Sequence, residues 1–177
     1  QFENLCFEEV SQAFHLQAGA DAGDNLIRNC RFANAVTVPA LQVQVESSGN
    51  QLLANWFSST TSSLGSRAIY LLEEGNVVAM NAISGPYQFA LQVGTGAGTT
   101  EVTRVDHNSI RVTGGLAGGG ISLLNASELC MRNNIVYGDG TSTGLSLQTV
   151  TFAADTSCGG DGTVANVNIN HATQCSS

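Results

Sequence analysis

The sequence predicts an all-β fold, a parallel β-helix (solenoid) of about seven coils, each of roughly 25–27 residues. Three observations predict it: a six-residue motif recurs at a nearly fixed interval, a second strand pattern follows most copies, and no helical periodicity is present. A fixed period of this size is typical of solenoids, in which each repeat buries its apolar face only against its neighbours. We therefore expect residues 1–177 to form a single domain of stacked coils.

The recurring motif reads apolar, any residue, a small or polar residue, often Asn, any residue, apolar. Its copies begin near residues 2, 27, 52, 78, 105, 131 and 164. In the first six copies the closing apolar residues recur at a nearly constant interval, and Ile169 closes the seventh after a longer gap. We expect the first six to stack in one inward column: Phe7, Phe32, Phe57, Ile83, Ile110 and Val136.

A second strand pattern, small-apolar-polar-apolar, follows each of the first six copies. Its segments are 13–16, 40–43, 68–71, 88–91, 120–123 and 144–147. Alternation with period 2 is the signature of a strand with one buried face. The expected second inward column is Phe14, Leu41, Ile69, Phe89, Ile121 and Leu145. Glycine and asparagine at 23–25, 49–50 and 75–76 fit tight turns, because both residues tolerate positive φ.

Asparagine occupies one position of the motif in four consecutive coils. These residues are Asn55, Asn81, Asn108 and Asn134. A side-chain amide at a corner between strands can bond to the coils on both sides and satisfy backbone groups of the turn. We therefore predict a structural ladder of stacked amides along this corner.

The repeated motif with its stacked asparagines resembles the right-handed parallel β-helix superfamily, which includes pectate lyases, polygalacturonases and many surface proteins. The resemblance spans roughly residues 2 to 169 and implies the fold. Enzymes of that superfamily carry clusters of acidic and basic residues on the outer face of one sheet. The polygalacturonase strings N-T-D, D-D, G-H-G and R-I-K do not occur here, and the chain has no lysine.

One outward acid–base group stands out in the fifth and sixth coils. It comprises Arg104, Asp106, His107 and Arg132, with Asp106 and Arg132 at the same motif position. These residues are the catalytic candidates if the protein is an enzyme. The alternatives are a surface ion pair, worth about 0–1 kcal/mol, and a hydrogen-bonded structural role for His107. Glu3 and Arg28 should form a similar pair.

Glutamates precede several copies of the motif at nearly the interval of the repeat itself. They are Glu46, Glu74, Glu101 and Glu128. A stripe of carboxylates at the spacing of successive coils would repel unless screened, so a bound Ca²⁺ is one interpretation. The other is a set of solvated turn residues.

The outward side of the second strand is nearly free of charge and rich in amides. The residues that we assign to a partner or glycan face are His15, Gln42, Gln44, Tyr70, Gln92 and Gln148. A flat, uncharged face of this kind suits lateral packing or a neutral glycan.

Composition narrows the functional classes. The net charge is −8, and the six cations are all arginine, which argues against nucleic acid and anionic membrane surfaces as partners. No apolar run is long enough to span a bilayer. Five cysteines in a chain with 11% charged residues indicate a secreted protein, and Cys158 and Cys175 could form a disulfide around the last repeat. Cys6 and Cys30 either pair or fill space, and the state of Cys130 stays open.

These patterns lead to one functional hypothesis and two alternatives. We expect a non-catalytic extracellular or cell-surface structural or adhesive module that associates through its ends or a flat sheet face into filaments. The alternatives are a carbohydrate-active enzyme (a lyase, hydrolase or epimerase) and a passive glycan-binding domain. Other copies of the chain or a surface polysaccharide are the expected partners, and Ca²⁺ is the only cofactor considered.

Overall fold

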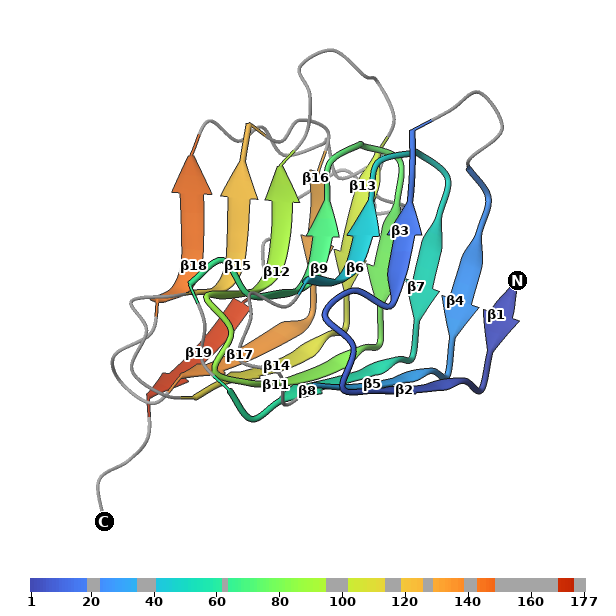
Figure 1. The fold of residues 1–177 in the computed structure, drawn as a ribbon. Coiled ribbons are helices and arrows are strands. Elements are labelled where there is room, and N and C mark those ends of the chain that lie inside the picture. The colour runs from blue at the N-terminus through green and yellow to red at the C-terminus, as the bar shows by residue number, and fades with distance from the viewer. Residues whose placement is uncertain are drawn as a thin grey trace.

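The computed structural model describes residues 1–18, 23–34, 41–61, 64–94, 102–113, 119–125, 129–138, 143–148 and 169–173. These residues form a parallel β-solenoid with three sheets, which we name A, B and C in the order in which the chain visits them. Sheets A and C stand opposite each other and sheet B closes the base between them (Figure 1). The predicted all-β parallel architecture is therefore confirmed.

Each sheet takes one strand from each successive coil. Sheet A consists of β1 (Phe2–Glu3), β4 (Leu26–Arg28), β7 (Gln51–Leu53), β10 (Val77–Ala79), β13 (Thr103–Asp106) and β16 (Leu129–Arg132). Sheet B consists of β2 (Cys6–Glu8), β5 (Arg31–Asn34), β8 (Trp56–Ser59), β11 (Ala82–Gly85), β14 (Ser109–Val112), β17 (Asn134–Gly138) and β19 (Ile169–Thr173). Sheet C consists of β3 (Phe14–Leu16), β6 (Leu41–Val45), β9 (Arg67–Leu71), β12 (Phe89–Gly94), β15 (Gly119–Leu124) and β18 (Thr143–Gln148).

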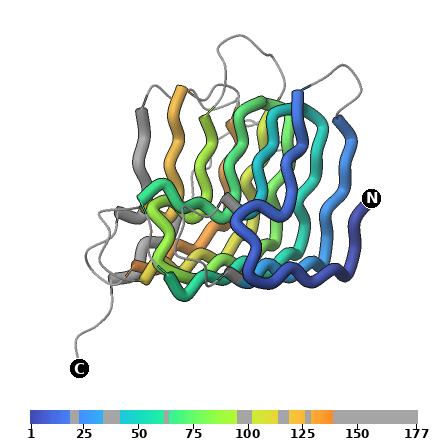
Figure 2. The backbone as a smooth tube through the Cα atoms, viewed as in Figure 1, coloured from blue at the N-terminus to red at the C-terminus, as the bar shows by residue number. Residues whose placement is uncertain are grey.

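The chain winds coil upon coil, as the tube in Figure 2 shows. The described residues belong to six coils, each of which places one strand in every sheet. Because parts of these coils lie outside the described ranges, the described residues together amount to more than four complete turns. The predicted seventh coil is represented in the described part of the chain by β19 alone. Within the described residues, no helix has the length and apolarity needed to cross a bilayer.

The first predicted core column is present in register. Phe7 pairs with Phe32, Phe32 with Phe57, and the column continues through the equivalent residues of β11, β14 and β17. The rings of Phe32 and Phe57 stack with centroids 4.6 Å apart, and those of Phe7 and Phe32 are 5.3 Å apart. Identical ring positions in consecutive coils therefore form one continuous apolar stack.

The second core column differs from the prediction at two positions. Val43 and Leu91, not Leu41 and Phe89, pair with Ile69. Each error is a shift of two positions along the strand, which keeps the same face inward because side chains alternate with period 2. The apolar pattern alone therefore could not distinguish the two registers.

The same two-position shift occurs at the last strand. Val136 pairs with His171, whereas Ile169 pairs with Asn134. The motif makes Ile169 the counterpart of Val136 as a closing residue, and the observed pairing differs from that alignment by two positions.

The corner between sheets A and B has the same backbone geometry in six coils. One residue of each coil adopts positive φ there, between 51° and 58°. These residues are Asn4, Asn29, Ala54, Met80, His107 and Asn133. In the first five the backbone N–H donates to a carbonyl of the next coil. The sharp turn thus keeps its backbone paired while placing the following residue inward.

Candidate functional site

The predicted asparagine ladder forms along the corner between sheets A and B. The Oδ1 atom of Asn81 accepts from the backbone N–H of Asn55 at 2.9 Å and from its Nδ2 at 3.1 Å. The Nδ2 atom of Asn81 donates to Leu52 O at 2.8 Å and to Asn108 Oδ1 at 3.0 Å. Asn108 and Asn134 repeat the arrangement, and all four amides are buried. The amides of Asn55, Asn81 and Asn108 therefore each join three coils, and that of Asn134 joins its own coil to the one before it.

A second asparagine ladder lies at the turn that precedes sheet A. Asn50 Oδ1 accepts from the N–H of Asn25 at 3.1 Å, and Asn76 Oδ1 accepts from the N–H of Asn50 at 2.9 Å. Thr103 takes the next place, where its hydroxyl accepts from the N–H of Gly75 at 3.0 Å. The repeat pattern predicts these asparagines only as turn residues. Their separation by one repeat each was the signal that could have revealed this ladder.

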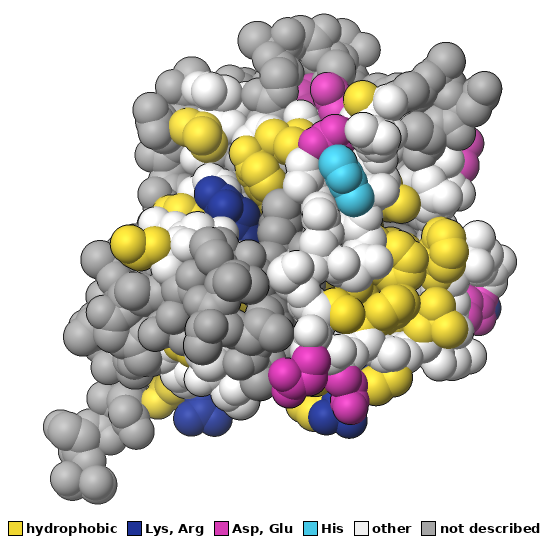
Figure 3. Space-filling view, in the orientation of Figure 1, with side chains coloured by type: hydrophobic (Ala, Val, Ile, Leu, Met, Phe, Trp, Pro, Cys, Tyr) yellow, Lys and Arg dark blue, Asp and Glu magenta, His cyan; other side chains and the backbone are white. Residues whose placement is uncertain are grey.

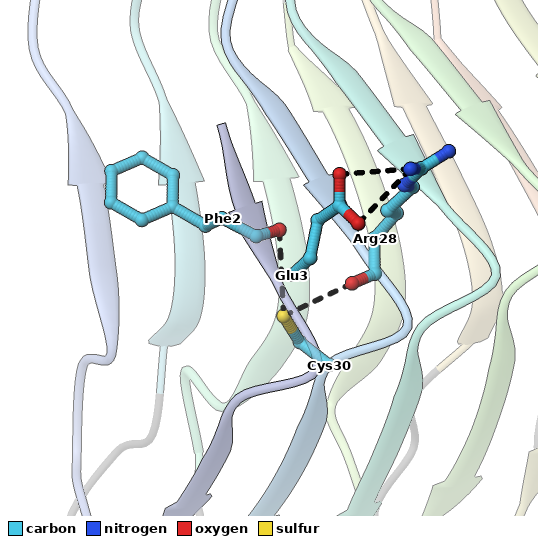
Figure 4. A network of polar contacts seen from close by, with 4 residues as sticks. All are labelled: Phe2, Glu3, Arg28 and Cys30. Carbon is cyan, nitrogen blue, oxygen red and sulfur yellow. Dashed lines mark hydrogen bonds and ion pairs between the residues drawn. The ribbon is translucent and has the colours of Figure 1, made fainter.

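Cys30 holds the ladder position in the second coil, where its N–H donates to Asn55 Oδ1 at 3.0 Å. Its thiol lies 3.3 Å from Arg28 O and 3.7 Å from Phe2 O (Figure 4). Beside it, the predicted pair between Glu3 and Arg28 is present at 2.9 Å. A thiol therefore substitutes for the amide at this end of the ladder.

Cys6 and Cys30 are both free thiols, so the interpretation in which they pair with each other is wrong. Cys6 is exposed on β2, whereas Cys30 is buried at the corner, one register position away. The predicted disulfide partners Cys158 and Cys175 lie outside the described residues.

The catalytic candidates lie on and beside the outer face of sheet A. Arg104 and Asp106 share the outward side of β13, and Asp106 pairs in register with Arg132. One carboxylate oxygen of Asp106, Oδ1, is buried without a hydrogen-bond partner. His107 is the corner residue with positive φ, and Asn133 Nδ2 lies 3.1 Å from its Nε2. The structure therefore places Arg104, Asp106 and Arg132 on one outer face, with Arg132 in register with Asp106, and places His107 at the corner.

The predicted calcium ligands are only partly within the described residues. Glu46 bonds to Gln44 Nε2 and lies 3.1 Å from His15 Nε2, whereas Glu74 is fully buried in the turn before Asn76. In the register of sheet C, the residue of the next coil that is equivalent to Glu46 is Leu72, not Glu74. Glu101 and Glu128 lie outside the description. The two described glutamates do not share a register position, and the Ca²⁺ site stays a prediction.

Four of the six residues predicted for the glycan face form one column on sheet C: His15, Gln44, Tyr70 and Gln92. Within this column Gln92 is buried, which contradicts its predicted place on an open face. This face carries more charge than the pattern suggested, because the Arg67 guanidinium lies 4.8 Å from the Tyr70 ring centre and its Nε donates to Gln92. The side chain of Gln148 is not among those described.

Gln42 was predicted on that face but is buried. Its Oε1 accepts from the Tyr87 hydroxyl at 2.8 Å, and its Nε2 donates to Ser58 O at 3.2 Å. Burial of an amide costs little when both of its ends are hydrogen-bonded. Burial also raises the pKa of the Tyr87 hydroxyl above its usual range, and the bond to Gln42 only partly offsets this.

The outer face of sheet B carries two arginine–aromatic pairs that the sequence pattern did not predict. Arg31 lies over the exposed ring of Trp56 at 4.7 Å, and Arg111 lies 5.9 Å from the ring centre of Tyr137. In both cases the residues are partners in register, so their separation by one repeat was the signal available. Arginine above an aromatic ring gains from the ring quadrupole, and it leaves other N–H groups available for a ligand.

Within the described ranges, no group of three or more His, Cys, Asp or Glu side chains could hold a metal ion. Comparison of the chain with protein-family models, with curated proteins and with solved structures finds no match.

Proposed function

We propose that the chain is a non-catalytic structural or adhesive module of an extracellular or cell-surface protein, a right-handed β-helical rod that associates with other copies of itself. The observation that supports this proposal is the set of hydrogen bonds formed by the buried asparagine side chains. In two ladders, each buried Asn side chain bonds to a neighbouring coil. Amides that join successive coils stiffen the rod, which is what a spacer or scaffold requires.

The surface of the rod favours self-association more than a catalytic role. Half-buried phenylalanines Phe2, Phe7 and Phe14 pack at the N-terminal coil, where hydrophobic side chains gather at the surface (Figure 3). Exposed edge strands and apolar rings are the features through which one solenoid coil pairs with another. Head-to-tail contact of this kind repeats without closing and so produces filaments.

A carbohydrate-active enzyme is the second candidate, and Asp106 is the observation that favours it. A buried carboxylate oxygen without a hydrogen-bond partner, on a face that also carries Arg104 and Arg132, is the kind of group that can act as an acid or base. A lyase, hydrolase or epimerase of acidic or neutral glycans would be the reaction class.

Size-exclusion chromatography with light scattering, followed by electron microscopy at neutral pH, tests the first proposal. Oligomers or filaments that grow with protein concentration are expected. A strict monomer at every concentration would remove self-association from the proposal.

A panel of polysaccharides, assayed for unsaturated products, reducing ends and bound sugar, tests the second candidate. Activity that Asp106→Asn abolishes and that the exposed-site control Glu9→Gln retains would replace the structural proposal. No turnover with any polysaccharide, in protein that melts normally, leaves the structural module as the better account.

A further inference from the structure

The outer face of sheet B presents two columns of outward side chains, one residue from each of the first six coils. The first column is Cys6, Arg31, Trp56, Ala82, Ser109 and Ile135. The second column is Glu8, Ala33, Ser58, Ser84, Arg111 and Tyr137. We call these twelve residues the sheet B face. Large and small side chains are mixed within both columns.

The composition of the sheet B face matches a protein interface more than an ordinary surface. Trp56 is 45% exposed and Ile135 is 52% exposed, although both are large and apolar. Trp, Tyr and Arg are the residue types that dominate binding energy at interfaces. In a chain with 11% charged residues, this face still holds two of the six cations, Arg31 and Arg111.

We propose that the sheet B face binds the same face of a second copy of this chain, in an antiparallel arrangement. The proposal rests on the self-associating function above and names its lateral interface. The two copies are related by a two-fold axis along the strand direction, midway between β8 and β11. Such an isologous contact requires the face to be complementary to itself.

Rotation about that axis places large residues opposite small ones. In the first column, Trp56 meets Ala82 of the second copy, and Arg31 meets Ser109. In the second column, Arg111 meets Ala33. Successive strands are about 4.8 Å apart, so these positions coincide across a flat sheet without any shift of register.

Charge complementarity between Glu8 and Arg111 favours this orientation over a rotation about the rod axis. In the free chain Glu8 lies 3.9 Å from Arg31, and the Glu8 side chain is 63% exposed. Arg111 forms none of the ion pairs found among the described residues. The rotation brings Glu8 of each copy next to Arg111 of the other, so that two new ion pairs form. A rotation about the rod axis would instead leave Arg111 facing Ser109, with no carboxylate nearby.

The interface is small, so the association should be weak. Six strands about 4.8 Å apart and two columns wide cover roughly 300 Å² per copy, which is less than the about 800 Å² of a standard interface. Lateral contact therefore adds to assembly at high local concentration, and salt should weaken it because the two ion pairs lie at the rim.

Sedimentation velocity on the full chain under reducing conditions, from about 10 µM to 1 mM, tests the proposal. Glu8→Arg and Arg111→Glu should each weaken dimer formation about tenfold, and the double variant should restore it. Ala82→Arg, which fills the space opposite Trp56, should abolish the dimer. The matched controls Gln51→Glu and Gln51→Arg, on sheet A, should leave it unchanged, and thermal melting verifies folding.

The outcomes separate this interface from self-association in general. Assembly that no sheet B variant alters overturns the interface but leaves the proposed function standing. A monomer throughout overturns both. Loss of the dimer in Glu8→Arg without rescue by Arg111→Glu overturns the antiparallel arrangement.

Discussion

The hydroxyl of Tyr87 donates to Oε1 of Gln42 across 2.8 Å and so joins two coils that are not neighbours. Tyr87 precedes β12, whereas Gln42 lies in β6, and β9 stands between these strands in sheet C. Both side chains are almost fully buried. This is therefore a cross-coil contact that the repeat itself does not require.

Tyr87→Phe should destabilise the fold by about 1–3 kcal/mol, because it leaves a buried amide oxygen without a donor. Chemical denaturation of the variant measures this. Tyr70→Phe, at a half-buried position, is the control and should change stability far less. The double variant Gln42→Met with Tyr87→Phe should recover part of the loss, and no recovery would show that the hydrogen bond is not the cause.

Alkaline pH should destabilise the protein through the same tyrosine. Burial raises the pKa of Tyr87 in the folded state, whereas in the unfolded chain a tyrosine loses its proton near about pH 10. Above that pH the unfolded state binds fewer protons than the folded state, so the free energy of unfolding falls as pH rises. The contribution is fully present below about pH 10.

Melting curves between about pH 8 and 11.5 test this by comparing the native chain with Tyr87→Phe. The difference in stability between the two should shrink as pH increases. Parallel curves over the whole range would contradict a role for Tyr87 ionisation.

The sequence was sufficient to predict the architecture because the motif occurs once in each coil, so that equivalent residues recur at a nearly fixed spacing. Stacked Phe32 and Phe57, and the ladder through Asn81, follow directly from positions one repeat apart. The two-position errors at Leu41 and Phe89 arose because alternation specifies a face, not a register.

The candidate site was less predictable because lateral partners do not follow the repeat. Arg67 contacts Tyr70 on its own strand and Gln92 on the neighbouring strand, which adds charge to a face that the alternating pattern left neutral. The bond from Tyr87 to Gln42 skips a coil. Periodicity cannot show contacts of this kind, since they depend on side-chain reach.

Asn81→Ala should cost about 2–4 kcal/mol, since it removes a donor and an acceptor that serve three coils. Ser109→Ala, exposed on sheet B, is a matched surface control and should be close to neutral. Adding Asn55→Ala should cost less than the sum of the two single losses, because the second variant removes a partner already lost. Urea titrations measure all three.

Cys30→Asn should stabilise the protein by about 1 kcal/mol by extending the amide ladder into the second coil. Its Nδ2 would replace the long contact of the thiol with Phe2 O, and its Oδ1 would accept from the Leu5 N–H as Asn55 Oδ1 accepts from the Cys30 N–H one coil on. Cys30→Ala is the control and should gain nothing. A lower melting midpoint for Cys30→Asn than for Cys30→Ala would show that the corner has no room for the amide.

Met80→Asn should also stabilise the fold, because Met80 has φ of 58° and its side chain is 59% exposed. A left-handed backbone costs most residues about 1–2 kcal/mol, whereas Asn tolerates it, and three other coils already have Asn at this corner. A gain of about 0.5–1 kcal/mol is expected. Met80→Ala keeps the strained backbone and should be nearly neutral, while Met80→Val should destabilise because a β-branched side chain resists positive φ. Equal stability of the Asn and Val variants would show that the backbone conformation does not limit stability at this corner.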